Sequence, residues 1–201
     1  SNFYLSFELF ANRLREESIT VVDLPTAYFH MWMAHIKKNQ SQMPEEIKTL
    51  ICGGEALAAE HVSTWFVSNK HNARLINSYG PTETTVVCTA TEVEIDKEVS
   101  IGAPLLGTKI CLFDAKFPSN EGDLAVYGPS IANRYISNND NDRPLKTMLM
   151  GENCYQTGDR CVNKDSRLFY LGRLDRQMKI GGVRFQPEEI DLQILVFDKL
   201  L

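Results

Sequence analysis

Residues 77–86 read Asn77-Ser78-Tyr79-Gly80-Pro81-Thr82-Glu83-Thr84-Thr85-Val86 (NSYGPTETTV), and they follow the short run RLI at 74–76. The run indicates a strand, and a Gly-Pro pair after a strand makes a tight turn. A tyrosine ring can stack on a purine, while threonine hydroxyls and loop N–H groups can hold phosphate oxygens. One acid beside phosphates is explained by Mg²⁺, which binds carboxylate and phosphate oxygens. For this stretch alone, a strand-turn-strand hairpin with surface threonines is an equally good interpretation.

Helix and strand patterns alternate on the N-terminal side of this stretch. Apolar residues at helical spacing predict a first helix, short β-branched runs predict strands, and Pro25 stands where a helix can begin. The expected helices are 3–16, 27–38 and 55–69, and the expected strands are 19–23, 49–52 and 74–77. This alternation predicts α/β layering around a largely parallel sheet.

The pattern changes after Thr84. Short strands separated by turns are expected at 86–95, 109–113, 123–127, 159–162 and 168–171, which makes this half β-rich. Residues 138–142 (NNDND) predict a mobile polar loop. Beyond Asp175 the sequence predicts a strand, a turn at Gly181-Gly182, a second strand, and a helix that begins at Pro187.

Composition excludes several classes of protein. The 201 residues carry 21 Lys and Arg against 26 Asp and Glu, a net charge of −5, so no basic surplus suggests nucleic-acid binding. No apolar run reaches membrane-spanning length, and no signal peptide is predicted. The five cysteines are odd in number and lack a C-x-x-C spacing, so we expect reduced thiols in a cytoplasmic protein rather than a zinc site or disulfides.

Two further stretches have possible chemistry. In YQTGDRC (155–161), Asp159 follows a Thr-Gly turn and can offer two carboxylate oxygens to the two hydroxyls of a ribose. The stretch GRLDRQMKIGGVRFQPEEID (172–191) is dense in charge. Taken singly, the first is explained by an ordinary turn and the second by a solvated hairpin.

Together and in this order, these stretches resemble the core motifs of adenylate-forming enzymes, specifically the amino-acid-activating adenylation domains of nonribosomal peptide synthetases. NSYGPTE resembles the family's N-x-Y-G-P-T-E, and YQTGD its Y-x-T-G-D. EGDLAVYGPSIANRYI (121–136) is similar to another motif with departures, and 172–191 matches a fourth, with Gly181 where an arginine is usual.

The resemblance implies the central part of such a domain, truncated at both ends. Residues 1–85 would form the α/β-layered part and residues 86–174 the β-rich part of the large subdomain. Residues 175–201 would begin a small, swinging C-terminal lobe with Asp175 as its hinge. The truncated chain alone is expected to be inactive.

The resemblance also implies roles for individual residues. Thr82 and Glu83 would be catalytic, with Glu83 holding Mg²⁺. Contacts to ATP or AMP would come from Gly54, Glu55, Asn77, Ser78, Tyr79, Gly80, Thr82, Asp159, Tyr170 and Arg173. Among these, Asn77 and Tyr79 would lie at adenine, and Asp159 at the ribose. The amino-acid pocket would be lined by Asp23, Ile51, Gly53, Ser78, Val86 and Val87.

The implied reaction joins ATP and an amino acid into aminoacyl-AMP and pyrophosphate, and then transfers the acyl group to the phosphopantetheine thiol of a peptidyl carrier protein. Two alternatives remain open. One is a degenerate nucleotide-binding or scaffold module without catalysis. The other is an acyl- or aryl-CoA ligase of the same superfamily.

Overall fold

A five-stranded sheet organises the N-terminal half of the protein. The structure, a computed structural model, describes residues 6–115, 117–135 and 147–175, and the backbone alone of 178–180 and 183–185. The strands of this first sheet are β1 (Val21–Pro25), β2 (Thr49–Gly53), β3 (Arg74–Tyr79), β4 (Thr89–Glu92) and β5 (Ala103–Pro104), in that spatial order. Strands β1 to β3 are parallel, whereas β4 and β5 are antiparallel to their neighbours. The expected largely parallel sheet is therefore mixed.

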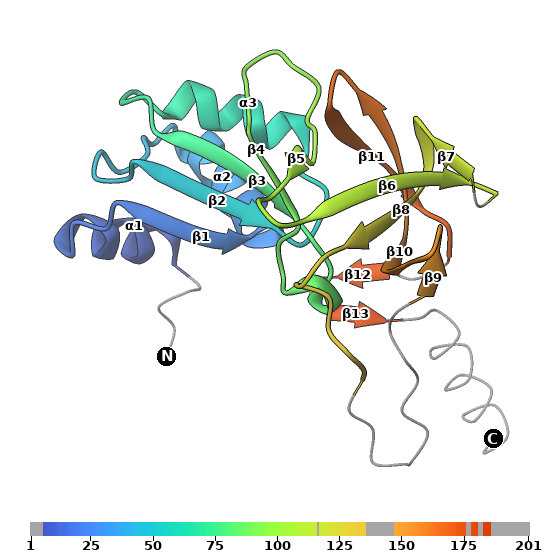
Figure 1. Cartoon of the computed structure of the whole chain (residues 1–201). Coiled ribbons are helices and arrows are strands. Elements are labelled where there is room, and N and C mark those ends of the chain that lie inside the picture. Colours follow the sequence, from blue (N-terminus) through green and yellow to red (C-terminus); the bar gives the residue numbers. More distant parts are fainter. Residues whose placement is uncertain (1–5, 116, 136–146, 176–177, 181–182, 186–201) are drawn as a thin grey trace, which may run out of the picture.

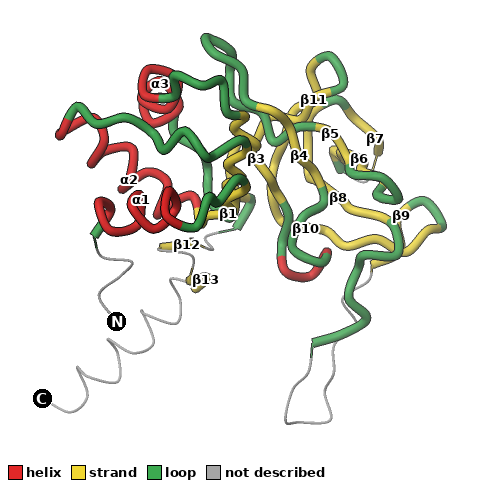
Figure 2. The backbone as a smooth tube through the Cα atoms, turned by 90° about the vertical axis from the view of Figure 1, so that its left-hand side faces the viewer, coloured by secondary structure: helices red, strands yellow, loops and turns green. Residues whose placement is uncertain are grey.

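Three helices cover one side of this sheet: α1 (Phe7–Glu16), α2 (Thr26–Asn39) and α3 (Ala59–Ser68), as Figure 2 shows. Alternate strand residues such as Leu50 and Leu75 point into the layer between sheet and helices and are almost completely buried. Phe29, Trp32 and Trp65 fill the same layer. Among the described residues, the core cluster that includes the helices thus lies on one face of the sheet.

The start of α3 differs from the sequence prediction. A helix was expected from Glu55, but it begins at Ala59. Gly54 has φ +97°, and Ala58 is extended, with its N–H donating to His30 Nε2 at 3.1 Å. This contact with α2, which lies far away in sequence, holds residues 54–58 as a loop, so local helix propensity does not decide their conformation.

A second, wholly antiparallel sheet forms the other half (Figure 1). Its strands are β6 (Lys109–Asp114), β7 (Phe117–Ser119), β8 (Glu121–Tyr127), β9 (Thr147–Leu149), β10 (Glu152–Lys164) and β11 (Arg167–Arg173). They follow the order β11-β10-β8-β6-β7, and β9 pairs with β10. Leu112, Leu124, Val126, Cys161 and Leu168 pack as its core.

The first sheet continues beyond residue 86, and the β-rich character expected from there on includes its last two strands, β4 and β5. Strand β4 is shorter than the expected 86–95, and it pairs with β3 in the first sheet. Thr85 and Val86 have φ +60° and +69°, so the backbone reverses there and runs back along β3. The first sheet therefore extends to Pro104.

Beyond Asp175 the structure describes two short strands, β12 (Met178–Ile180) and β13 (Val183–Phe185), which pair antiparallel, as expected of the two strands there; the turn expected at 181–182 lies outside the described residues. The predicted polar loop at 138–142, the helix from Pro187, and residues 3–5 of the first helix lie outside the described residues. Among the described helices, none has the length and apolar character needed to span a bilayer.

Candidate functional site

The site is built around the loop that joins β3 to β4. Gly80 lies so close to this loop that a Cβ there would stand 2.5 Å from Val86 O. The Cys88 N–H donates to Tyr79 O at 2.8 Å, which closes the loop at its base. Thr82–Thr84 form one turn of 3₁₀ helix. The loop therefore folds back on itself and carries Glu83 inward, where that residue is only 5% exposed.

Glu83 is fixed by the segment that follows β8. The Tyr135 hydroxyl donates to Glu83 Oε1, and the Ala132 N–H donates to the Glu83 backbone oxygen at 2.8 Å. Thr85 Oγ1 donates to Ser130 O at 2.7 Å. Burial, and next the hydrogen bond to Glu83, raise the pKa of Tyr135, so its hydroxyl stays a donor at neutral pH. These contacts set the direction of the Glu83 carboxylate.

Asp159 lies in β10, opposite the end of β3, and is 7% exposed. Its Oδ2 accepts a hydrogen bond from the Tyr79 hydroxyl, and its Oδ1 accepts one from Arg173 Nη1 at 2.9 Å. Burial, and next the negative charge of Asp159, raise the pKa of Tyr79 well above its ordinary value, so the phenol remains protonated. The Tyr79–Asp159 bond joins the first sheet to the second.

Arg173 bridges two carboxylates. Besides Asp159, it binds Asp175 through Nε to Oδ1 at 2.6 Å and Nη2 to Oδ2 at 2.8 Å, a bidentate pair. Hydrogen bonding to Asp175 is the main cause that raises the pKa of Arg173. Gly158, with φ +75°, leaves the room for this guanidinium, because a Cβ there would lie 2.7 Å from Arg173 Nη2.

The structure thus brings together Tyr79, Asp159 and Arg173, which were predicted to contact the nucleotide. Tyr170 lies near them, because the charge of Asp159 is the second cause, after burial, that raises the pKa of Tyr170. Asn77 lies two residues before Tyr79 in the sequence, but the residue is 4% exposed and its side-chain amide donates to Ser100 O at 2.8 Å. Its predicted contact with adenine remains a prediction.

Four of the six residues predicted for the amino-acid pocket lie in strands, on the sheet face opposite the helices. Asp23 stands beside Ile51 in register, and Gly53 beside Ser78. Gly53 is needed for this approach, since a Cβ there would lie 2.4 Å from Ser78 Oγ. Val86 and Val87 follow in the loop after β3, and Val86 is 67% exposed. Gly54 and Glu55 belong to the loop before α3, and the charge of Glu55 acts to raise the pKa of His30.

Two residues of the site were missed by the sequence reasoning. Tyr135 holds Glu83, and Thr157 Oγ1 accepts from the Asp159 N–H at 3.0 Å while donating to Leu124 O at 3.0 Å. Thr157 is part of the quoted YQTGD stretch, so its position next to Asp159 offered a signal. Tyr135 lies 52 residues from Glu83, and only the fold brings them together.

Three buried cysteines of the described chain, Cys52, Cys88 and Cys161, are poor candidates for nucleophiles. Burial raises the pKa of the Cys52 thiol to about 12, of Cys88 to about 11 and of Cys161 to about 12. A thiol with so high a pKa is protonated at neutral pH and is a poor nucleophile. Among the described residues, no group of three or more His, Cys, Asp or Glu side chains is arranged to hold a metal.

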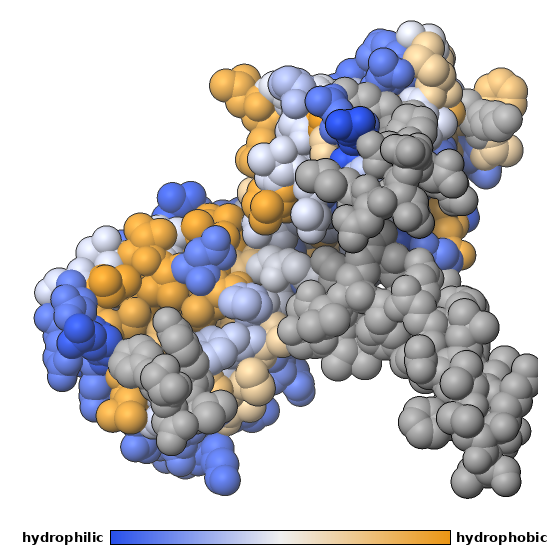
Figure 3. All heavy atoms as spheres, turned by 90° about the horizontal axis from the view of Figure 1, so that it is seen from below, coloured by the Kyte–Doolittle hydropathy of each residue, from blue (hydrophilic) through white to orange (hydrophobic). Residues whose placement is uncertain are grey.

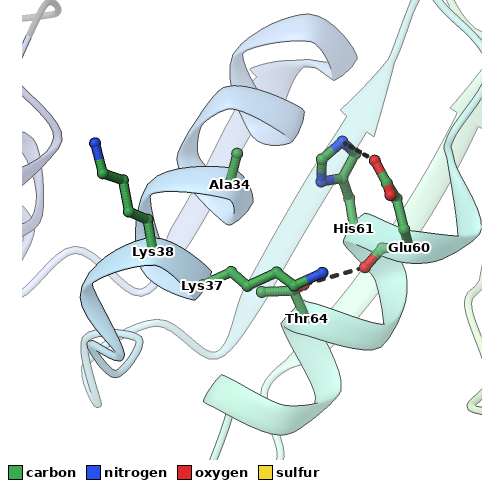
Figure 4. A pocket seen from close by; sticks show the side chains of 6 residues that line it. All are labelled: Ala34, Lys37, Lys38, Glu60, His61 and Thr64. Carbon is green, nitrogen blue, oxygen red and sulfur yellow. Dashed lines mark hydrogen bonds and ion pairs between the residues drawn. The ribbon is translucent and has the colours of Figure 1, made fainter.

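A separate hollow of about 310 Å³ lies between α2 and α3, away from this site (Figure 4). Lys37, Lys38, His61 and Glu60 are among its lining residues. The ring of the lining residue His61 stacks on the ring of His30 with centroids 4.4 Å apart, and His30 Nε2 accepts the Ala58 N–H. Burial, and next the neighbouring His61, lower the pKa of His30, while Glu55 and Glu60 oppose the shift.

The His30 contact predicts a pH dependence. A histidine whose pKa is lowered by folding binds fewer protons in the folded state than in the unfolded state. Its contribution to the free energy of unfolding is therefore complete above about pH 6.5 and is lost as the pH falls through the folded pKa. Protonation also removes the acceptor of the Ala58 N–H. We expect hydrogen–deuterium exchange of the 54–60 segment, corrected for the intrinsic rate, to become less protected between pH 7.5 and 5.5. His30→Gln should flatten this dependence and His35→Gln should not, whereas equal profiles would contradict it.

Comparison with known proteins gives a consistent match. Residues 2–136 match the family described as "AMP-binding enzyme". An isonitrile lipopeptide synthase of Streptomyces coeruleorubidus is 35% identical over 186 residues, which is 88% of this chain and 12% of that protein. A solved NRPS protein containing adenylation and PCP domains is 23% identical, with a TM-score of 0.79 over 94% of this chain and 40% of that one. A four-domain nonribosomal peptide synthetase bound to AMP and glycine is 28% identical, with a TM-score of 0.74 over 94% of this chain and 14% of that one.

Proposed function

Because the chain belongs to the AMP-binding enzyme family and has the fold of a nonribosomal peptide synthetase adenylation domain, we propose that it is part of an ATP-dependent ligase that activates an amino acid. The chain spans 12% of the lipopeptide synthase and 40% of the adenylation–PCP protein. The activity is therefore proposed for the protein that contains this chain.

One observation carries the proposal: the end of β3 and the loop after it are each associated with a buried carboxylate, because Tyr79 in β3 donates to Asp159 and the loop itself carries Glu83. Ligands of open α/β sheets bind at the carboxyl ends of parallel strands, and β1, β2 and β3 all end here. In the proposed complex, Asp159 accepts hydrogen bonds from the ribose hydroxyls, and the ring of Tyr79 lies at the adenine. Tyr170 and Arg173 flank the ribose and phosphate.

The charge balance supports Mg²⁺ at Glu83. Arg173 is bound to both Asp159 and Asp175, whereas the Glu83 carboxylate accepts from the neutral hydroxyl of Tyr135. A triphosphate beside these groups needs added positive charge. Mg²⁺ needs only one or two carboxylates together with phosphate oxygens, so a single oriented glutamate suits it. The bound ion would neutralise phosphate charge, while Thr82 would donate to a phosphate oxygen.

The finer parts of the proposal follow from the relatives. Because one similar structure holds AMP and glycine and another contains a PCP domain, we propose an amino acid as the substrate and a phosphopantetheine-bearing carrier protein as the acceptor. Asp175 is proposed as the hinge of a C-terminal lobe, with the subdomain limits near residues 85 and 174. A cytoplasmic location remains a prediction.

The test is amino-acid-dependent exchange of labelled pyrophosphate into ATP by the complete adenylation domain, with a panel of amino acids. We expect exchange with at least one amino acid and none without Mg²⁺. Fatty and aromatic acids are tested in parallel, and their activation is measured as the hydroxamate that forms when hydroxylamine is present. Activity with these alone would favour an acyl- or aryl-CoA ligase, and AMP binding without exchange would favour a degenerate nucleotide-binding module. The 201-residue chain by itself is expected to give no exchange.

A further inference from the structure

The loop that carries Glu83 is held by one short segment of the second half, residues 128–135, which follows β8. Figure 1 shows the loop and this segment below the two sheets, on the side of the molecule that faces the viewer in Figure 3. The segment binds Glu83 twice: the Ala132 N–H donates to its backbone oxygen and the Tyr135 hydroxyl to its carboxylate. The direction of the Glu83 carboxylate therefore depends on what holds the 128–135 segment.

Tyr155 contacts this segment from β10. It is 7% exposed, and it packs against Ile131, the buried apolar residue of the segment, in a small core cluster. The pKa of Tyr135 is raised first by burial, then by the hydrogen bond to Glu83, and further by Tyr155, whose side chain makes a hydrogen bond with that of Tyr135. Tyr155 thus meets the segment with its ring at Ile131 and with its hydroxyl at the residue that binds Glu83.

The same strand carries Asp159. Alternate residues of a strand point to one face of the sheet, and Tyr155 and Thr157 are both buried. Thr157 Oγ1 in turn accepts the Asp159 N–H at 3.0 Å. Strand β10 therefore holds one carboxylate of the candidate site directly, at Asp159, and reaches the other, Glu83, through two tyrosines.

We propose that Tyr155 is a positioning residue for the metal carboxylate: its hydroxyl holds Tyr135, and Tyr135 orients Glu83. This inference rests on the proposed function, in which Glu83 binds Mg²⁺ and Asp159 binds the ribose. Groups that orient a metal ligand affect metal affinity without touching the metal. Loss of the Tyr155 hydroxyl should therefore weaken the metal site and leave the ribose contact as it is.

The test uses Tyr155→Phe in the complete adenylation domain, because phenylalanine keeps the ring that packs on Ile131 and removes only the hydroxyl. Calorimetry gives the affinity for α,β-methylene ATP, an analogue that cannot release pyrophosphate, with and without Mg²⁺. The wild type should bind the analogue more tightly with Mg²⁺. Tyr155→Phe is expected to reduce this gain roughly tenfold, the lower end of the effect of losing a partner of a metal ligand. The affinity for AMP without metal should stay unchanged.

Two further variants sharpen the test. Tyr127→Phe removes the hydroxyl of another buried tyrosine of the second sheet, which belongs to a different core cluster, and it should change neither affinity. Tyr155 acts through Tyr135, so the double variant Tyr135→Phe/Tyr155→Phe should lose no more of the gain than Tyr135→Phe alone. Losses that add would show that the two hydroxyls act separately, and they would overturn the proposal.

The outcomes separate this inference from the function on which it rests. A wild type whose affinity for the analogue does not respond to Mg²⁺ contradicts the metal site of the proposed function, and this inference with it. A wild type that responds, with a Tyr155→Phe variant that responds equally, overturns the role of Tyr155 alone. A Tyr155→Phe variant that loses AMP affinity in the same proportion has lost structure in general, which also contradicts a positioning role.

Discussion

Glu83→Gln is expected to lower kcat for amino-acid adenylation in the complete domain by roughly a hundredfold to a thousandfold, about the effect of removing one group that stabilises transition-state charge. The amide keeps the shape of the side chain and an acceptor for Tyr135, but it loses the charge that would hold Mg²⁺. Because that charge matters most while the α-phosphate reacts, kcat should fall along with a rise in KM for ATP. The measurement is initial-rate exchange over a range of ATP at several Mg²⁺ concentrations.

Raising Mg²⁺ should restore part of the Glu83→Gln activity, because a weakened site is filled at higher metal concentration. Glu45→Gln, at an exposed position after α2, is the matched control and should leave the rates unchanged. A Glu83→Gln enzyme whose rate does not respond to Mg²⁺, or that loses less than threefold, would show that Glu83 is not the metal carboxylate. Tyr135→Phe should give a smaller loss in the same direction, because it leaves the carboxylate in place but less firmly oriented.

The second large effect is expected for Asp159→Asn, in the affinity for the nucleotide. Hydrogen bonds from the ribose hydroxyls to a charged carboxylate contribute about 1.5–3 kcal/mol, which corresponds to roughly tenfold to 150-fold weaker binding. These bonds exist equally in the bound nucleotide and in the transition state, so kcat at saturating ATP should change little. Calorimetric titration with AMP, together with KM for ATP, tests this.

Asp159 also binds Arg173 and Tyr79, so its replacement affects more than a ligand contact. Tyr79→Phe removes one of these partners without changing charge, and Asp123→Asn on the adjacent strand β8 is a matched control. The added Mg²⁺ that helps Glu83→Gln should not help Asp159→Asn. An Asp159→Asn protein that binds AMP as the wild type does would exclude the ribose contact.

The parts of the fold that could be predicted from sequence are those decided by local periodicity. The buried alternation in β2 and the apolar spacing in α2 correspond to elements found within one or two residues of their predicted limits. The start of α3 could not be predicted in this way, because a hydrogen bond from Ala58 to a histidine 28 residues away decides it. Likewise, β4 is assigned to the first sheet by the positive φ angles of Thr85 and Val86, which no local pattern of β-branched residues indicates.

The candidate site could be predicted as a set of residues but not as a set of contacts. Its sequence motifs indicate Tyr79, Glu83, Asp159 and Arg173. The contacts depend on strands that pair across long stretches of chain. Arg173 binds both Asp159 and Asp175, and the Asn77 amide donates to Ser100 O. Register in the second sheet sets Asp159 opposite Arg173. Such pairing follows from the tertiary fold rather than from the motifs themselves.

The hydrogen bonds of Asp159 and Glu83 have a consequence for how such sequences diverge. Tyr79–Asp159 joins the two sheets, and Tyr135–Glu83 attaches the β3–β4 loop to the segment after β8. A gene copy released from selection for catalysis would still be under selection to keep these residues, because their loss weakens the assembly of the domain. Retention of the motifs in a genome is therefore poor proof of a working synthetase. Residues that form no ion pair within the described part of the chain, such as the exposed Asp23 predicted for the amino-acid pocket, should drift first and are better markers of a lost activity.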